Sequence, residues 1–286
     1  MTEARDIPHA RDVYTLEGQA GPERAFLDSL ERGRLHHAWL LVGPEGVGKA
    51  TFAYRAARRL LGAAPDEAFG PLGSNPEHPV SRQVAARSHP DLMVLQREVE
   101  DGKARRNIPV DEARALPEFF SKSPAQAAYR VAIIDSADDL NPSAANAVLK
   151  TLEEPPERGV LFLVSHAPGG LLATIRSRCR RLAFAPPPLE EAVAWVTREA
   201  GVSEHDAQAL LHIARGAPGR ALRLAGAAAL EADAAARRLV EQLPKADDSA
   251  ALALADSFRG AAGADRFALT IDRIADALHE RAAAAA

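Results

Sequence analysis

The chain has 286 residues, of which 47% are hydrophobic and 26% charged, and its formal net charge is −4. These are ordinary values for a globular protein of two or three domains, and the net charge gives no overall attraction to nucleic acid or to an anionic membrane. The one cysteine, Cys179, excludes a disulfide framework and a cysteine-based zinc site. A cytoplasmic location without a membrane anchor is expected, because the first residues carry charges without an apolar core and no run of about 18 apolar residues is present.

Strand and helix patterns alternate over the first two thirds of the chain, after an extended lead-in over 1–20. Short apolar runs predict strands at 39–42, 92–96, 131–134, 160–164 and 180–184, and helical spacing predicts helices at 21–33, 51–61, 110–121, 142–154 and 171–176. Residues 62–90 are expected to be irregular, and 99–106 to form a charged turn or hairpin. The alternation predicts an α/β fold: a parallel sheet with helices on both faces, whose ligands bind beyond the carboxyl ends of the strands.

Three consecutive prolines at 186–188 form the clearest boundary in the chain. After them the patterns predict helices only, at 189–200, 203–215, 219–230, 239–243, 250–258 and 267–278. We therefore expect three parts: a nucleotide-binding-type domain over 1–186, a small helical domain over 187–235 and a C-terminal helical region over 236–286.

The stretch WLLVGPEGVGKAT at 39–51 predicts a phosphate-binding loop between a strand and a helix. Glycines let backbone N–H groups approach an anion, the helix N-terminus adds partial positive charge, and the lysine reaches the outer phosphates. The predicted nucleotide-binding residues are Gly43, Pro44, Gly46, Val47, Gly48, Lys49, Ala50 and Thr51. One feature departs from the pattern: Ala50 stands where a Ser or Thr hydroxyl would bind Mg²⁺, and Thr51 comes one residue late.

Asp135 ends the predicted strand at 131–134, which is the place of the acidic residue that holds Mg²⁺ through water. In active enzymes of this type a glutamate follows and orients the attacking water, whereas Ser136 follows here. A serine cannot polarise water as a carboxylate does, so the site is expected to be degenerate. The alternative interpretation is that Asp135 only caps a loop.

Several stretches together resemble the bacterial clamp-loader subunits of the AAA+ class. They are HHAWLLVGPEGVGK at 36–49, SHPDL at 88–92, VAIIDSAD at 131–138, NPSAANAVLKTLEEPP at 141–156 and IRSRC at 175–179. The resemblance runs from about residue 17 to about residue 225. It implies an AAA+ fold in which 187–235 is a helical lid and 236–286 a collar region, which is short for the family.

Two kinds of subunit share this fold, an ATP-hydrolysing motor called gamma/tau and a stator called delta-prime. Four positions resemble the stator: Ala50, Ser136, Ser165-His166 in place of a Thr/Ser-Asn sensor pair, and Gly219 in place of a lid arginine. The resemblance therefore implies a site that takes ATP or ADP weakly or without hydrolysis. The alternatives are a gamma/tau-like ATPase, or a regulatory adaptor that uses the fold only for protein contacts.

The family usually has four zinc-binding cysteines before the strand at 92–96, and none lies within 62–90. His78 and His89 alone do not make a structural zinc site, so we predict no zinc. His89 is expected to be a structural loop residue.

Ser177-Arg178-Cys179 matches the motif that, in this family, supplies an arginine finger to a neighbour's ATP. Such a guanidinium neutralises charge building on the γ-phosphate in trans. Arg178 is the predicted finger and Arg176 its nearest rival, while a solvated basic turn is the other interpretation of these arginines. Cys179 is expected to be a small buried residue rather than a nucleophile.

The resemblance implies a subunit that assembles with gamma/tau and delta and helps to load the sliding clamp onto primer-template DNA. It implies no polymerase activity for the chain itself.

Overall fold

The computed structural model describes residues 8–284, except 98, 101–102, 106, 226, 243–251, 253–254, 257 and 260–262. The chain divides into two compact units, Met1–Pro188 and Leu189–Ala286. The expected helix at 250–258 lies largely outside the described residues, and the division of the second unit into lid and collar stays a prediction.

The first unit is built on a five-stranded parallel sheet with the order β2-β5-β6-β1-β7. Its strands are β2 Leu92–Gln96, β5 Arg130–Asp135, β6 Gly159–Ser165, β1 Ala38–Val42 and β7 Arg180–Ala183. The strand that precedes the phosphate loop therefore lies between β6 and β7, and β6 separates it from β5. This arrangement confirms the predicted α/β fold with a parallel sheet.

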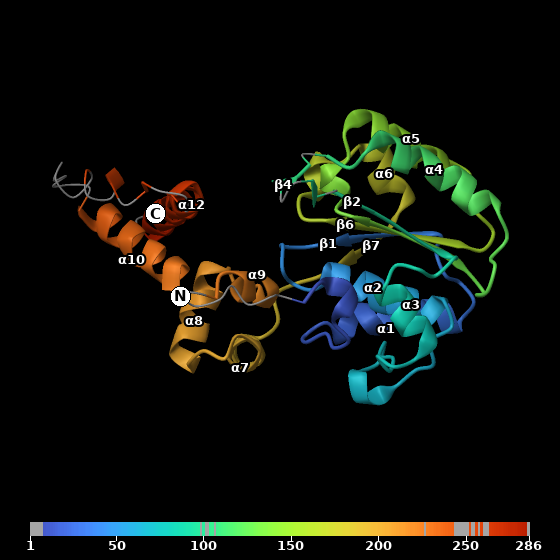
Figure 1. Ribbon diagram of the computed structural model, residues 1–286, viewed down its shortest axis with the longest axis horizontal. Helices are drawn as coiled ribbons and strands as arrows, with labels where there is room; N and C mark the ends of the chain where they lie inside the picture. The colour runs from blue at the N-terminus through green and yellow to red at the C-terminus, as the bar shows by residue number, and fades with distance from the viewer. Residues whose placement is uncertain are drawn as a thin grey trace. The chain divides into compact units, whose positions relative to one another are not determined.

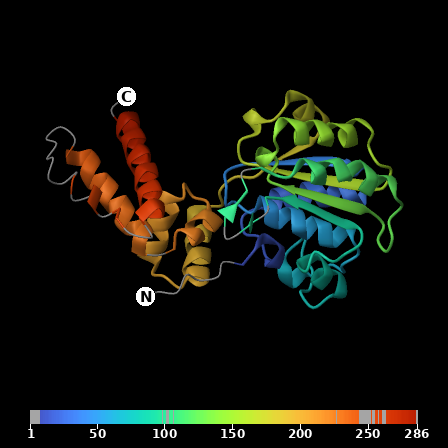
Figure 2. The same cartoon turned by 45° about the horizontal axis from the view of Figure 1, so that its top comes forward.

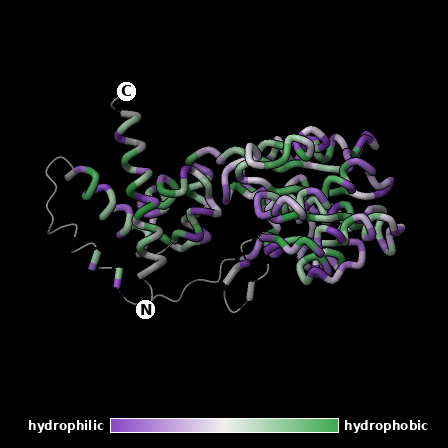
Figure 3. Tube along the Cα trace, turned by 90° about the horizontal axis from the view of Figure 1, so that it is seen from above, coloured by the Kyte–Doolittle hydropathy of each residue, from purple (hydrophilic) through white to green (hydrophobic). Residues whose placement is uncertain are grey.

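Helices cover both faces of the sheet (Figure 1 and, from another direction, Figure 2). One face is covered by α1 Ala20–Glu31, α2 Lys49–Leu60 and α3 Pro79–Ala85, the other by α4 Val110–Ser121, α5 Pro142–Glu153 and α6 Ala173–Arg178. Successive strand residues alternate between the two faces, and both faces are apolar and buried. In the hydropathy-coloured trace, green segments accordingly run through the interior of this unit (Figure 3).

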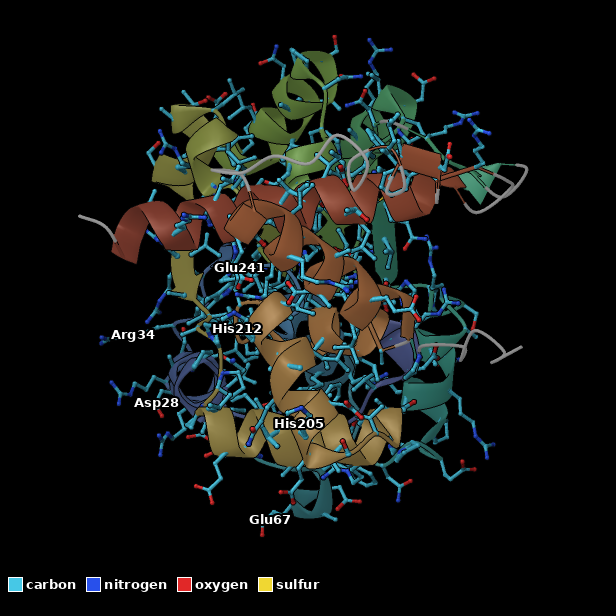
Figure 4. The ribbon with its side chains drawn as sticks, turned by 90° about the vertical axis from the view of Figure 1, so that its left-hand side faces the viewer. Asp28, Arg34, Glu67, His205, His212 and Glu241 are labelled. Atoms are coloured by element: carbon cyan, nitrogen blue, oxygen red, sulfur yellow. The ribbon has the colours of Figure 1, made fainter. Side chains whose placement is uncertain are left out.

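An aromatic cluster joins α1 and α2 to the sheet. The ring of Phe26 lies 5.4 Å from Trp39, 5.7 Å from Phe52 and 5.8 Å from Phe162, measured between ring centres. The opposite side of α1 carries exposed charges such as Asp28, and Arg34 in the loop after α1 also points outward (Figure 4). Because α1 is apolar on one side only, it packs as a single outer layer.

The segment 62–90, expected to be irregular, contains a 3-10 turn, η2 Glu67–Phe69, and the seven-residue helix α3. That prediction was wrong for α3, whose start is stabilised by Pro79 at its first turn and by His78, which accepts a hydrogen bond from the Val80 N–H. Two helical turns are too short to produce a recognisable apolar period. The hairpin predicted at 99–106 is present as β3 Val99–Glu100 and β4 Lys103–Ala104.

A buried ion pair anchors this segment to the layer of α1 and α2. Arg55 Nη2 lies 2.8 Å from Glu23 Oε1, and both side chains are buried. Arg55 Nη2 also donates to the Phe69 carbonyl at 2.8 Å. The pair therefore ties the turn at 67–69 to α2, which carries the phosphate loop at its start.

The second unit contains helices only, within the ranges that the structure describes: α7 Leu189–Ala200, α8 Glu204–Ile213, α9 Pro218–Arg223, α10 Ala227–Gln242 and α12 Gly263–Ala284. The single helix expected at 219–230 was wrong, because α9 ends at Arg223 and α10 begins at Ala227. The buried Arg273 of α12 donates to the Ile213 carbonyl at 2.9 Å and so ties α12 to α8. None of the described helices has the length and apolar content needed to cross a membrane.

Candidate functional site

The phosphate loop connects β1 to α2 at the carboxyl edge of the sheet. Gly43 and Gly48 have φ of 150° and 94°, which favour glycine. A Cβ on Gly43 would lie 2.2 Å from the Phe184 carbonyl oxygen, and one on Gly48 would lie 2.3 Å from Leu16 Cδ1. The loop therefore keeps the tight backbone of a phosphate cradle, packed against β7 on one side and the lead-in segment on the other.

Lys49 is folded back onto this loop. Its Nζ donates to the carbonyls of Gly43 at 2.6 Å and Pro44 at 2.5 Å, and only 3% of the residue is exposed. Burial lowers the pKa of Lys49 to about 8, although the carboxylates of Asp138, Glu45 and Asp135 oppose the shift. The side chain that would reach an outer phosphate is thus satisfied by the chain's own acceptors.

The cradle fits a phosphate group, but the usual metal hydroxyl is missing. Ala50 and Thr51 both lie in the first turn of α2, and consecutive helical residues point about 100° apart. Asp135 ends β5, where burial and the like charge of Asp139 raise its pKa to about 6. These residues fit an anion better than they fit Mg²⁺, because one hydroxyl ligand is absent and the nearby carboxylate ionises less readily.

The Ser136 hydroxyl is bound to a neighbouring side chain of its own turn. Its Oγ donates to Asp139 Oδ2 at 2.9 Å, and Asp139 in turn forms an ion pair with Arg97 at 3.1 Å. The hydroxyl is therefore engaged within its own turn, η3 Ala137–Asp139.

Asp138 is a site residue to which the sequence analysis assigned no role. Its carboxylate accepts hydrogen bonds from Ser165 Oγ at 2.7 Å and from the backbone N–H groups of His166 at 2.5 Å and Ala167 at 3.4 Å. It therefore fixes the end of β6, at Ser165, and the start of the loop that follows, at His166 and Ala167. The acidic run at 135–139 was visible in the sequence, but its partners are 27–29 residues away, so only the sheet reveals the contact.

Arg178 lies at the other edge of the sheet. It ends α6 directly before β7, and β7 runs parallel to β1 with Arg180 beside Trp39. Arg178 is therefore at the amino ends of the strands, whereas the phosphate loop follows the carboxyl end of β1. Its guanidinium forms an ion pair with Glu153 at 3.1 Å and donates to the Thr174 carbonyl at 3.2 Å.

The remaining predicted residues lie apart from both the phosphate loop and Arg178. Cys179 packs against the core between the sheet and α4 to α6, and burial raises the pKa of its thiol to about 12. His78 caps α3, and the buried His89 accepts a hydrogen bond from the Asp91 N–H at 3.1 Å. Gly219 belongs to α9 in the second unit. Each histidine thus has a local structural bond, and the prediction of no zinc stays a prediction.

The strand order, the glycine-rich loop after β1 and the aspartate that ends β5 define the class: the chain is an AAA+-type phosphate-loop protein. The family described as "DNA polymerase III, delta subunit" matches residues 18–188. DNA polymerase III subunit delta' of Pseudomonas aeruginosa is 36% identical over 230 residues, 79% of this chain and 67% of that protein. Subunit delta' of Escherichia coli is 36% identical over 198 residues, 68% of this chain and 56% of that protein. The chain belongs to the family of DNA polymerase III delta' subunits.

The Escherichia coli match spans only 56% of that relative's own length. Among solved structures, a DNA polymerase III gamma subunit-related protein of Thermotoga maritima is 22% identical, with a TM-score of 0.42 over 87% of this chain and 77% of that one. A TM-score at that level carries no conclusion about function. The resemblance to clamp-loader subunits, inferred from the motifs, is confirmed by the family match.

Proposed function

We propose that this chain is a clamp-loader subunit that acts as a stator: it assembles with gamma/tau and delta and supplies Arg178 to ATP held by an adjacent gamma/tau subunit. Through that complex it would help to load the sliding clamp onto primer-template DNA. It would make no DNA itself.

The position of Arg178 relative to the phosphate loop carries this proposal. Arg180 lies beside Trp39, four residues before Gly43, so strand geometry separates it from the loop by about 13 Å along the sheet. Arg178 is farther back still, and its side chain is 37% exposed. A finger here can act only on a nucleotide that another subunit brings to the amino edge of the sheet.

The chain's own site supports a passive role. Lys49 donates to Gly43 and Pro44, Ala50 offers no hydroxyl, and Ser136 is engaged with Asp139. When bound, ATP or ADP would be held by the backbone of 43–49 and by Lys49 after it leaves the loop carbonyls. We propose weak binding without appreciable hydrolysis, and no zinc.

Reconstitution with gamma/tau and delta tests the proposal. The assembled loader should hydrolyse ATP when clamp and primed DNA are present, and Arg178→Ala should remove the part of this turnover that depends on the finger. Arg176→Ala, which changes an exposed arginine of the same helix, is the matched control. An unchanged rate for Arg178→Ala in a loader that still co-purifies would disprove the finger.

The alternative is a gamma/tau-like ATPase, which the retained cradle favours. It predicts Mg²⁺-dependent turnover by the isolated chain, abolished by Lys49→Ala. The adaptor alternative predicts that the chain joins a complex whose ATP turnover is indifferent to both Arg178 and Arg176.

A further inference from the structure

The carboxylate of Glu153 faces the proposed finger from a neighbouring helix. Glu153 ends α5 and Arg178 ends α6, and Oε1 of the first lies 3.1 Å from Nη2 of the second. On its other side, Nη1 of Arg178 donates to the carbonyl of Thr174 at 3.2 Å. The guanidinium is therefore held from two directions.

The backbones that carry this pair are fixed by the core. Leu152, next to Glu153, and Ile175, one turn before Arg178, are buried in the same apolar cluster. Both helix ends are thus rigidly placed, and what remains free is the rotation of two long side chains. Arginine loses rotamer freedom when it is held in one geometry, so a partner that orients it beforehand lowers the entropic cost of its contact with the transferring phosphate.

From this geometry we infer that Glu153 is the positioning residue for Arg178. This inference rests on the proposed role of Arg178 as a finger. Glu153 holds the guanidinium at the amino edge of the sheet before the neighbour's nucleotide arrives. Arginine has five N–H donors, and the two bonds described here leave others for phosphate oxygens. Glu153 therefore does not need to be displaced completely for the finger to act.

An ordinary half-exposed ion pair would contribute only to the stability of this subunit. Glu153 is 52% exposed, and such pairs are weak and screened by salt. If Glu153 positions Arg178, loss of Glu153 should lower the rate of hydrolysis at the neighbouring site without changing the affinity of that site for ATP.

The test measures ATP turnover by the loader reconstituted with gamma/tau, delta, clamp and primed DNA. Subtracting the rate with Arg178→Ala from the wild-type rate gives the finger-dependent turnover. Glu153→Ala should lower this part about two- to fivefold, the scale of an exposed ion pair, with KM for ATP unchanged. Glu153→Gln keeps an acceptor but loses the charge, so its finger-dependent turnover should lie between those of the wild type and of Glu153→Ala. The difference between the wild type and Glu153→Ala should become smaller at high salt.

Glu154→Ala is the matched control, because it removes the neighbouring exposed carboxylate. It should leave turnover unchanged, and Glu153→Ala should have no further effect in the Arg178→Ala background. If Arg178→Ala itself has no effect, the proposed function fails. If Arg178→Ala has its effect while Glu153→Ala has none, raises turnover, or acts equally without Arg178, the positioning role is wrong and the finger stands.

Discussion

At the carboxyl edge of the sheet Lys49 is buried on its own loop carbonyls, while at the amino edge Arg178 is 37% exposed beside Glu153. In the proposed function both cations would neutralise phosphate charge. Their surroundings differ: near the phosphate loop, Asp138 accepts hydrogen bonds from Ser165 and from the His166 N–H, and Asp139 accepts one from Ser136, so these two carboxylates have partners within the chain. The difference teaches that the cation of the phosphate loop is already paired with its own backbone, whereas the guanidinium of Arg178 keeps part of its surface exposed.

The largest effect is expected from changing the shape of the finger while keeping its charge. Arg178→Lys should lose most of the finger-dependent turnover, because a lysine cannot form the forked contacts of a guanidinium. Fingers of this kind contribute about 10³–10⁵ in rate where they have been measured. ATP turnover by the reconstituted loader checks this, with co-purification as the control for assembly. Full activity of the lysine variant would mean that positive charge alone is required there.

The buried pair of Arg55 and Glu23, which joins α2 to α1, should have the largest effect on stability. Arg55→Ala leaves Glu23 buried and unpaired, so we expect a loss of about 3–5 kcal/mol in the free energy of unfolding. Arg178→Ala should change it by no more than about 0.5 kcal/mol. Urea unfolding followed by Trp39 fluorescence in a Trp195→Phe background reports on the first unit, since Trp39 is buried in β1.

A double variant, Glu23→Leu with Arg55→Met, is the control for the charge itself. Replacing both members by apolar residues of similar size should recover most of the lost stability. If it is as unstable as Arg55→Ala alone, the bond from Arg55 to Phe69 matters more than the pair.

The burial of Lys49 predicts a pH dependence. Its folded pKa of about 8 lies below the ordinary value of 10.5, so between these values the unfolded chain binds a proton that the folded chain has released. The contribution of Lys49 to stability should therefore rise with pH from about 8 to 10.5, by at most about 3.4 kcal/mol, while above about pH 9 the raised pKa of the buried Cys179 thiol acts in the opposite direction. Lys49→Met should remove this rise, while Lys150→Met, at an exposed position, should keep it. Equal pH profiles for Lys49→Met and the unmodified chain would contradict the folded-back lysine.

The smallest effect should come from restoring the metal hydroxyl. Ala50→Thr should raise the affinity for ATP in a Mg²⁺-dependent way by no more than roughly tenfold, because Lys49 must still leave Gly43 and Pro44. Turnover should not appear, since Ser136 still lacks a carboxylate. Calorimetric titration with and without Mg²⁺ measures the gain, and Ala50→Val, which has no hydroxyl, is the matched control. An affinity gain in both variants would rule out a metal-ligand explanation.

Much of the first unit followed from local patterns. The strand at 92–96 and the helix at 110–121 were predicted with the bounds that the structure has, and the helix predicted from residue 142 begins there, where Asn141 caps it by accepting from the Ala144 N–H. Helix α3 and the break between α9 and α10 were missed, because short helices and three-residue connections leave little periodic signal.

The sequence allowed several residues of the candidate sites to be predicted, but not the side chains that they contact. Gly43 to Lys49 stood out by residue type and spacing, and Arg178 through the resemblance to the clamp-loader motif. Asp138 and Glu153 did not stand out, since acidic side chains near helix ends are common. Their partners are 27 and 25 residues away in the chain. No local sequence pattern predicts contacts between residues so far apart. They form because the parallel sheet places the ends of separate strands and helices side by side.

By itself, the sequence determined the class of fold, the family and two departures from the usual phosphate-loop pattern, Ala50 and Ser136, because each depends on residue type at short spacing. Only the tertiary structure decided that Lys49 is satisfied by its own loop, that Asp138 holds the segment after β6, and that Arg178 lies at the edge opposite the phosphate loop. The reason is physical: strand direction and burial are properties of the assembled sheet, and they determine which charges face inward and which face a partner.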